Sequence, residues 1–194
     1  MKNLIIASLC LAAACAALRG FTDAECSVIV AGKGGIMRLW TVADRDDSLF
    51  LRRKAAVLGR EELGSAGFRM LKEGMLATVR DTTNRGVGIA APQVGVSRRL
   101  IAVQRFDEPG EPFGFYANPE IVYYSRTCSP GPEGCLSVPD VSGSVLRSDT
   151  IVVRYTDEAS LRTVTDTVVG FTAVIFQHEV DHLDGVLFTD RMQE

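Results

Sequence analysis

The sequence predicts an α+β fold, in which mostly antiparallel strands surround a C-terminal metal-binding helix that carries H-E-x-x-H, with one earlier amphipathic helix. Three observations support this fold class. Short runs rich in β-branched residues, separated by turn residues, fill much of the second half of the chain. Apolar residues at helical spacing lie between Glu61 and Arg80. An apolar segment, residues 171–176, leads into the H-E-x-x-H motif at His178–His182.

Length and composition predict one soluble globular domain. A chain of 194 residues can bury a sizeable core. The formal net charge is −3, and acidic and basic residues are mixed along the chain, so no basic patch for nucleic acid is expected. The single tryptophan and few other aromatic residues offer no stacking platform for bases. We therefore expect no nucleic-acid partner.

The N-terminus resembles an export signal. Lys2 precedes an apolar run from Leu4 to Leu18 that ends in small residues, which predicts a signal peptide over residues 1–19. Export would place the protein in the periplasm, or at the membrane if the segment is retained or lipidated at Cys15. The alternative is translation from Met37, which would leave the protein in the cytoplasm.

The segment after the signal divides into an extension and a folded domain. Residues 20–36, with three closely spaced glycines, are predicted to be a linker or ordered extension, and the catalytic domain is predicted over residues 37–194. Within it, residues 37–42 predict a short strand and residues 44–47 a turn. The amphipathic helix follows between residues 61 and 80, with acidic residues in its first turn.

The remaining elements are mostly strands. Residues 86–93, Gly-Val-Gly-Ile-Ala-Ala-Pro-Gln, are so rich in glycine and alanine that their backbone must run close to another group, but they lack the pattern of a phosphate loop. Residues 129–132, Ser-Pro-Gly-Pro, predict an interruption between strands. Strands are predicted at residues 99–105, 115–124 with a break at Asn118-Pro119, around Val145, at 151–155, at 161–169 and, briefly, at 186–188.

The H-E-x-x-H motif predicts part of a metal site. Residues four apart share one face of a helix, so His178 and His182 can bind one ion, and Glu179 beside them can take a proton from a bound water. These are the only two histidines in the chain, and Gly185 is a suitable helix stop. The simpler interpretation is a helix with two exposed histidines.

A hydrolytic metal site needs a third protein ligand. The downstream candidates are carboxylates: Asp184 is too near in the helix, and Asp190 and Glu194 lie close to the chain end. The upstream candidate is Cys135, which follows a glycine in a turn-rich segment. Outside the predicted signal there are three cysteines, an odd number without the spacing of a disulfide framework, so one of them is expected to have a chemical role.

Three segments together resemble the motifs of the peptide deformylases, in the same order. They are residues 86–93, Glu133-Gly134-Cys135-Leu136-Ser137, and residues 177–183, Gln-His-Glu-Val-Asp-His-Leu. Weaker similarity extends from about Met37 to Asp190. The resemblance implies a hydrolase that removes the formyl group from N-formylmethionyl peptides and releases formate.

The resemblance also implies a ligand set and catalytic roles. One divalent ion would be bound by Cys135, His178 and His182 with water as the fourth ligand; Fe²⁺ is physiological in many members of the family, and Zn²⁺ or Ni²⁺ also occurs. Glu179 would act as general base and then as general acid.

The same resemblance assigns the oxyanion donors. By carry-over from the family, the tetrahedral intermediate would receive hydrogen bonds from the Gln93 side chain and the Leu136 backbone N–H.

Helix geometry predicts the substrate pocket. Phe171, Val174 and Ile175 share the helical face of the first histidine and should line an apolar pocket for a methionine side chain. Val87 should close this pocket, and the peptide backbone should pair alongside Gly88 as an added strand. Alternatively, these side chains are ordinary core residues.

One further contact is expected, and one disulfide is a hypothesis to be tested. Arg147 should form an ion pair with Glu133 or Asp181. If the protein is exported, Cys128 could form a disulfide with Cys135 and destroy the metal site.

Two other functions remain open at this point. One is a metallopeptidase that cleaves ordinary peptide bonds. The other is an exported relative that binds peptides without turning them over.

Overall fold

The computed structural model describes residues 18–193, so all but the last two residues of the predicted signal peptide lie outside the described part. Its helices are α2 (Asp23–Ala31), α3 (Arg45–Leu51), α4 (Arg60–Leu63), α5 (Ala66–Arg80) and α6 (Gly170–Leu183). Its strands are β1 (Gly88–Ala90), β2 (Leu100–Gln104), β3 (Phe113–Tyr124), β4 (Cys128–Cys135), β5 (Val138–Ser148), β6 (Thr150–Thr156) and β7 (Thr163–Val169). No helix within residues 18–193 is long and apolar enough to cross a bilayer.

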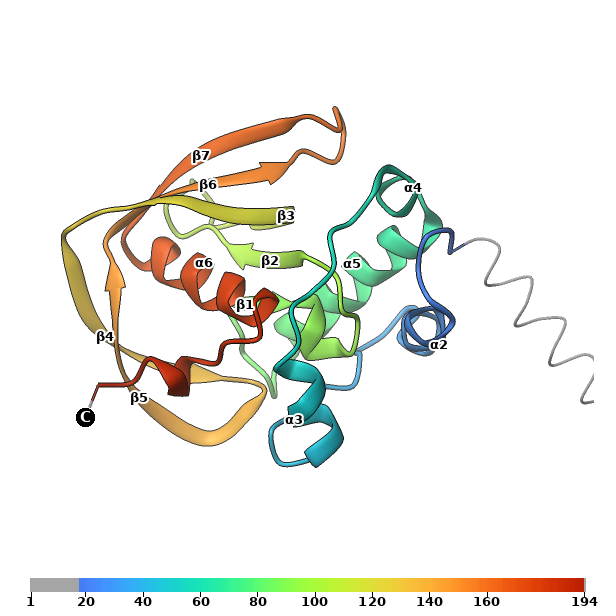
Figure 1. Cartoon of the computed structure of the whole chain (residues 1–194), viewed down its shortest axis with the longest axis horizontal. Coiled ribbons are helices and arrows are strands. Elements are labelled where there is room, and N and C mark those ends of the chain that lie inside the picture. The colour runs from blue at the N-terminus through green and yellow to red at the C-terminus, as the bar shows by residue number, and fades with distance from the viewer. Residues whose placement is uncertain (1–17, 194) are drawn as a thin grey trace, which may run out of the picture.

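Two antiparallel sheets enclose the last helix. Five strands form one sheet in the order β1-β2-β3-β6-β7, and β4 pairs with β5 in a separate two-stranded sheet. Helix α6 contacts strands of both sheets and lies at the centre of the molecule, while α5 packs against β1 and β2 (Figure 1). This mixture of helices and antiparallel strands confirms the predicted α+β class.

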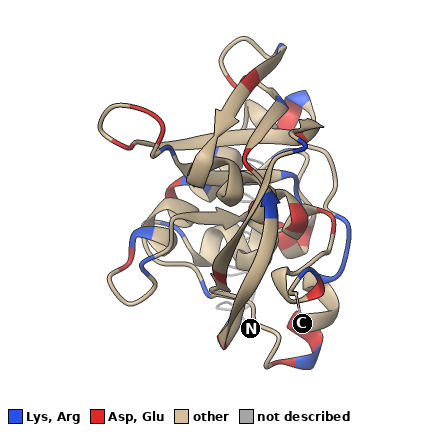
Figure 2. Cartoon of the chain, turned by 90° about the vertical axis from the view of Figure 1, so that its left-hand side faces the viewer, with Lys and Arg blue, Asp and Glu red and all other residues tan. Residues whose placement is uncertain are grey.

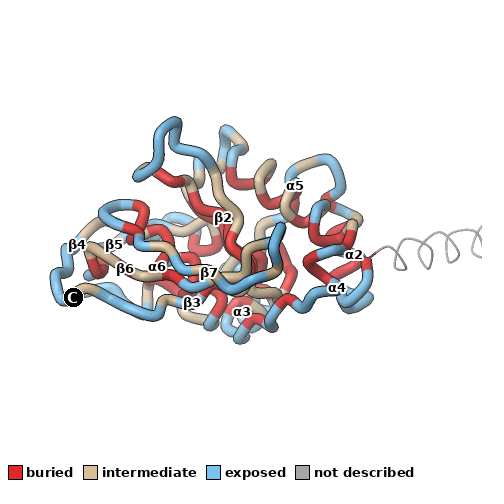
Figure 3. Tube along the Cα trace, turned by 90° about the horizontal axis from the view of Figure 1, so that it is seen from above, coloured by how far each residue is buried: buried red, intermediate tan, exposed pale blue. Residues whose placement is uncertain are grey.

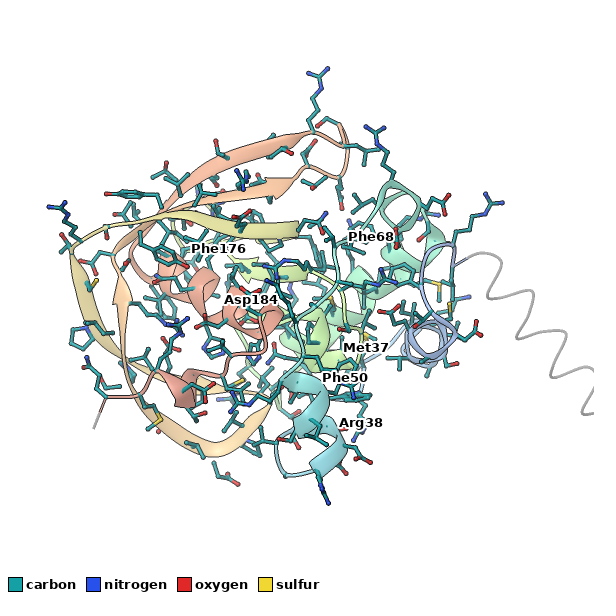
Figure 4. The ribbon with its side chains drawn as sticks, in the orientation of Figure 1. Met37, Arg38, Phe50, Phe68, Phe176 and Asp184 are labelled. Atoms are coloured by element: carbon teal, nitrogen blue, oxygen red, sulfur yellow. The ribbon has the colours of Figure 1, made fainter. Side chains whose placement is uncertain are left out.

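Buried apolar residues form two main clusters, one on the α5 side and one around α6. The first contains Phe68, Leu71 and Met75, and the second contains Ile175 and Phe176. Figure 4 shows Phe68 and Met37 on the α5 side of the molecule and Phe176 on α6. Figure 3 shows the burial along α5, β2 and α6, with exposed residues at the loops. Strand β1 contributes to both clusters, through Ile89 and Ala90, and therefore lies between the two helices.

The expectation of a single helix before the strands is wrong. Within the described residues, four helices precede β1. The segment predicted as one helix between residues 61 and 80 divides at Gly64-Ser65, where Ser65 caps α5 by accepting a hydrogen bond from the Phe68 N–H at 3.1 Å. The acidic residues assigned to its first turn belong to α4 instead.

The segment before Met37 is part of the folded molecule. Residues 20–36, predicted as a linker or ordered extension, contain α2, which starts at a capping box between Thr22 and Glu25. Residues 37–42 form no strand, and residues 44–47 are not an isolated turn: Asp44 caps α3 by accepting from two backbone N–H groups.

Two other expectations for the second half of the chain are wrong, and a disulfide between two of its cysteines is excluded. Residues 129–132 lie inside β4, whose outer edge is open, so its two prolines need not donate to a neighbour. Residues 186–188 form no strand; a short 3₁₀ helix covers Phe188–Asp190. Cys128 and Cys135 cannot form a disulfide, because they end one extended strand about 23 Å apart.

An ion-pair hub ties the N-terminal extension to the domain. The Arg98 guanidinium contacts Glu25 of α2 and Glu62 of α4, and also donates to the Gly20 carbonyl. Burial raises the pKa of Glu25, but the hydrogen bonds from Arg98 and Thr22 outweigh it and hold that pKa below its usual value. The stabilisation by Glu25 is therefore present above its unfolded pKa and is lost as the pH falls through the lowered folded value.

We predict that Arg98→Gln destabilises the protein by about 2–3 kcal/mol, because it leaves two largely buried carboxylates without their cation. Urea unfolding monitored by circular dichroism measures the change. Arg154→Gln is the matched control, since its ion pair with Glu120 is exposed and should contribute at most about 1 kcal/mol. Equal losses in the two variants would contradict the assignment of Arg98 as the hub.

Candidate active site

Helix α6 presents both histidines on one face toward β4 and ends shortly after the second. Its C-terminus is closed by Gly185, which has φ +74°, a value that favours glycine. The Val186 N–H donates to the Asp181 carbonyl at 2.9 Å, and a Cβ at Gly185 would clash with the Arg52 backbone. Gly185 thus fixes the end of the helix one turn after His178.

Cys135 meets this helix from the end of β4. A register shift at Gly134/Cys135 precedes a tight turn that returns the chain as β5. The Cys135 Sγ lies 3.2 Å from the His182 Nε2, and the ligand atoms of Cys135, His178 and His182 all lie within 4.8 Å of one another. One sulfur and two imidazole nitrogens converging on one point suit a tetrahedral divalent ion.

The charge balance at this point favours a bound cation. Burial lowers the pKa of His182 well below its usual value, so its imidazole is neutral and can act as a ligand. Burial also opposes protonation of His178, but hydrogen bonds to Cys135 and Glu133 outweigh it and raise that pKa to about 10. The groups around His178 therefore stabilise positive charge where the three ligand atoms meet.

Glu179 lies beside the ligand cluster and against β1. Its side chain is buried, and burial raises its pKa to about 7. A Cβ at Gly88 would lie 2.5 Å from the Glu179 Oε1, so only glycine lets strand and carboxylate approach this closely. A carboxyl group that titrates near neutrality can both accept and donate a proton.

Gln93 faces the same cluster from the 3₁₀ helix Ala91–Val94 that follows β1. Its Oε1 accepts a hydrogen bond from the Ala90 N–H at 2.8 Å, which turns its Nε2 toward Cys135, 3.5 Å from the sulfur. The amide therefore presents N–H donors to the place where the three ligand atoms converge.

A buried arginine fixes the two ligand-bearing elements relative to each other. Arg147 of β5 donates to Glu133 at 2.8 and 3.0 Å and to Asp181 at 2.6 Å, so the expected ion pair is confirmed with both partners. Glu133 also contacts the His178 Nδ1 at 2.8 Å. Burial disfavours the Glu133 carboxylate, but the hydrogen bonds from His178 and Arg147 hold its pKa at about 2.

A cavity of about 370 Å³ opens beside these groups. The five residues predicted to form the substrate pocket all line it: Val87, Gly88, Phe171, Val174 and Ile175. Gln93, Cys135, Leu136, His178 and Glu179 line it as well. The remaining candidate ligand, His182, is fully buried behind them.

Other residues of the cavity do not appear among the predicted site residues. Asn84 and Arg85 form part of its rim, and Pro132, Glu133 and Gly134 form its β4 wall. The position of Glu133 two residues before Cys135 was the available signal for its contact with His178. No pattern in the sequence marks Arg85, because only the turn after α5 brings it to the cavity.

Comparison with known proteins identifies the family. The sequence profile of the polypeptide deformylases matches residues 40–194. The chain belongs to the polypeptide deformylase family. Peptide deformylase 2 of Nostoc sp. is 43% identical over 152 residues, which cover 74% of this chain and 80% of the relative. The peptide deformylase of Thermus thermophilus is 42% identical over 155 residues, with 73% and 77% covered.

Solved structures support the same family. A class I type b peptide deformylase from Acinetobacter baumannii superimposes with a TM-score of 0.72 at 38% identity, covering 81% of this chain and 99% of that one. A second structure of that enzyme, bound to Met-Ala-Ser, gives a TM-score of 0.71 at 37% identity, with 81% and 98% covered. The chain is therefore a hydrolase of the peptide deformylase type. Peptide deformylases use a single metal ion, for which the Cys/His/His cluster offers a site.

We predict that Glu133→Gln weakens metal binding about 10- to 100-fold, because His178 loses the carboxylate that orients its ring and raises its basicity. Competition with a chelator measures the affinity, and circular dichroism checks that the variant is folded. Glu120→Gln, an exposed change of the same chemistry, is the control. If both variants hold the ion as tightly as the unmodified protein, Glu133 does not orient the ligand.

Proposed function

We propose that this enzyme removes the formyl group from N-formylmethionyl peptides and releases formate and a free amine. The observation that carries the proposal is the convergence of Cys135, His178 and His182 beside a cavity whose lining includes Glu179, Gln93 and the apolar side chains of Val87, Phe171, Val174 and Ile175. The relative bound to Met-Ala-Ser supports it, since that tripeptide is the product expected from deformylation of formyl-Met-Ala-Ser.

The ligand set we propose is Cys135, His178 and His182, with one divalent ion per chain. Fe²⁺ is the proposed physiological metal, and Zn²⁺ or Ni²⁺ suits the same mixture of sulfur and nitrogen ligands. Such an ion supplies Lewis-acid activation of water and of the formyl carbonyl.

The side chains then have distinct roles in the reaction. Glu179 accepts a proton from the water that attacks the formyl carbon, and delivers it to the amine nitrogen as the C–N bond breaks. The Gln93 Nε2 and the Leu136 N–H donate hydrogen bonds to the oxyanion formed in between. Burial of Glu179 and the hydrogen bond from Ala90 to Gln93 hold these groups in place before substrate arrives.

The peptide is proposed to bind along the free edge of β1. This strand ends the five-stranded sheet, and the carbonyl of Val87, the residue just before it, already accepts a hydrogen bond from the Gln104 N–H of β2. Since polar groups alternate in direction along a strand, those of Gly88 point away from β2 toward an added strand. The methionine side chain then enters the cavity between Val87, Phe171 and Val174.

The cellular location depends on the N-terminal segment. We propose export, to the periplasm or the membrane, if the segment over residues 1–19 acts as a signal, and a cytoplasmic enzyme if translation begins at Met37. The second alternative would remove α2 together with the buried side chains of Phe21 and Ile29, which favours the longer chain.

One assay separates deformylation from the two other functions. The protein is purified anaerobically with Fe²⁺ or Ni²⁺ and incubated with formyl-Met-Ala-Ser, and formate and free Met-Ala-Ser are measured. Release of both is expected. Cleavage of internal peptide bonds would indicate a metallopeptidase, and binding without turnover by the metal-loaded protein would indicate a non-catalytic relative.

We predict that Gln93→Leu lowers kcat about 10²- to 10³-fold, because an oxyanion donor is lost. Metal content should change little, since Gln93 is not one of the proposed ligands. Gln193→Leu, at an exposed position, provides the control. Unchanged turnover in Gln93→Leu would remove this residue from the mechanism.

A further inference from the structure

One arginine at the entrance of the cavity has no part in the proposed reaction. Arg85 lies in the turn between α5 and β1 and lines both the active-site cavity and the shallower cavity beside it. Its φ is +49°, in the left-handed region. The turn is held by hydrogen bonds from the Arg85 N–H to the Asp81 carbonyl and from the Asn84 side chain to the Thr78 carbonyl. The backbone of Arg85 is thus fixed at the rim.

The side chain of Arg85 carries an exposed charge at this entrance. The residue is exposed, and its Nε donates to the Thr82 carbonyl at 3.2 Å. No carboxylate within residues 18–193 forms an ion pair with it. The two acidic residues of the cavity wall, Glu133 and Glu179, are buried, and Glu133 is already paired with Arg147. Figure 2 shows acidic and basic residues scattered over one face of the molecule, without gathering by sign.

The direction of β1 sets which part of a bound peptide reaches Arg85. The strand runs from Gly88, beside Glu179, toward Gln93, beside Cys135. In the proposed reaction the formyl group therefore lies at the C-terminal end of β1. Arg85 precedes Gly88 by three residues, which places the two Cα atoms within about 10 Å of each other, the limit set by a fully extended chain. A peptide that runs antiparallel to β1 therefore brings its third residue within reach of the Arg85 side chain.

We propose that Arg85 is a specificity-determining residue that favours peptides with a carboxylate on the third residue. Either an acidic side chain or the C-terminus of a formyl tripeptide can supply this carboxylate, because both place the same charge at this position. This inference rests on the proposed deformylase function and on the binding of the peptide along β1.

The first test compares amidated formyl-Met-Ala-Asp with amidated formyl-Met-Ala-Asn, which has nearly the same shape without the charge. We expect kcat/KM to be about two- to fivefold higher for the aspartate peptide, the effect of an exposed ion pair. The difference should appear mainly in KM, because the charge lies far from the reacting bond. Comparison of formyl-Met-Ala-Ser as free acid and as amide tests the C-terminal carboxylate separately.

Variants assign the preference to Arg85. Arg85→Gln should abolish the preference for the aspartate peptide, and Arg85→Glu should reverse it. Adding 0.5 M salt should weaken the preference, because the screening length falls to about 4 Å at this ionic strength. Arg69→Gln is the control: it removes an exposed arginine of α5 that donates to the Gly64 carbonyl, and it should leave the preference intact. Arg69→Gln should also retain turnover of the asparagine peptide, and the Arg85 variants are judged by the ratio of kcat/KM for the aspartate and asparagine peptides.

Two results would overturn the proposal: equal kcat/KM for the aspartate and asparagine peptides, or a preference that survives Arg85→Gln. Both are distinct from a failure of the proposed function, in which no peptide of the series would release formate.

Discussion

The site depends on the buried ion pairs of Arg147. The proposed sulfur ligand lies on the two-stranded sheet and the proposed imidazole ligands lie on α6, so no single element contains the complete set. Arg147 joins them by contacting Glu133, two residues before Cys135, and Asp181, one residue before the second histidine. Desolvation makes such a network costly unless each charge is paired. Here each carboxylate has more than one partner, including Arg191 for Asp181.

A second constraint is the close approach of β1 to α6. Gly88 has no side chain, which lets the strand lie against Glu179 and Ile175. Gly88 also lines the cavity, at the edge of the five-stranded sheet. The Glu179 carboxylate and the proposed peptide-binding edge of β1 therefore lie side by side. Gln177 strengthens this arrangement from the other side of the helix. Its side-chain amide accepts a hydrogen bond from the Ser148 N–H and donates one to the Ser148 carbonyl. The helix is thus held by both sheets.

Much of the site could be predicted from the sequence because its chemistry requires rare residue types. The two histidines, one glutamate and a cysteine at fixed positions in two of the three motifs identify the cluster, and the helical face explains the cavity wall. The helices before residue 60 were missed although their caps, Thr22 with Glu25 and Asp44, could be read. The pairing of Arg98 with α2 and the placement of Arg85 at the rim could not be predicted, because each depends on how distant segments pack.

The central claim is that Cys135 completes a metal site with the two histidines of α6. Metal content per chain tests it most directly, measured after anaerobic purification with Fe²⁺ or Ni²⁺ in the unmodified protein, in Cys135→Ser and in Cys128→Ser. Cys128 is the matched control because it is the exposed cysteine at the opposite end of the same strand. We predict one ion per chain in the unmodified protein and in Cys128→Ser, with a large loss in Cys135→Ser. Full metal content in Cys135→Ser would contradict the proposed ligand set.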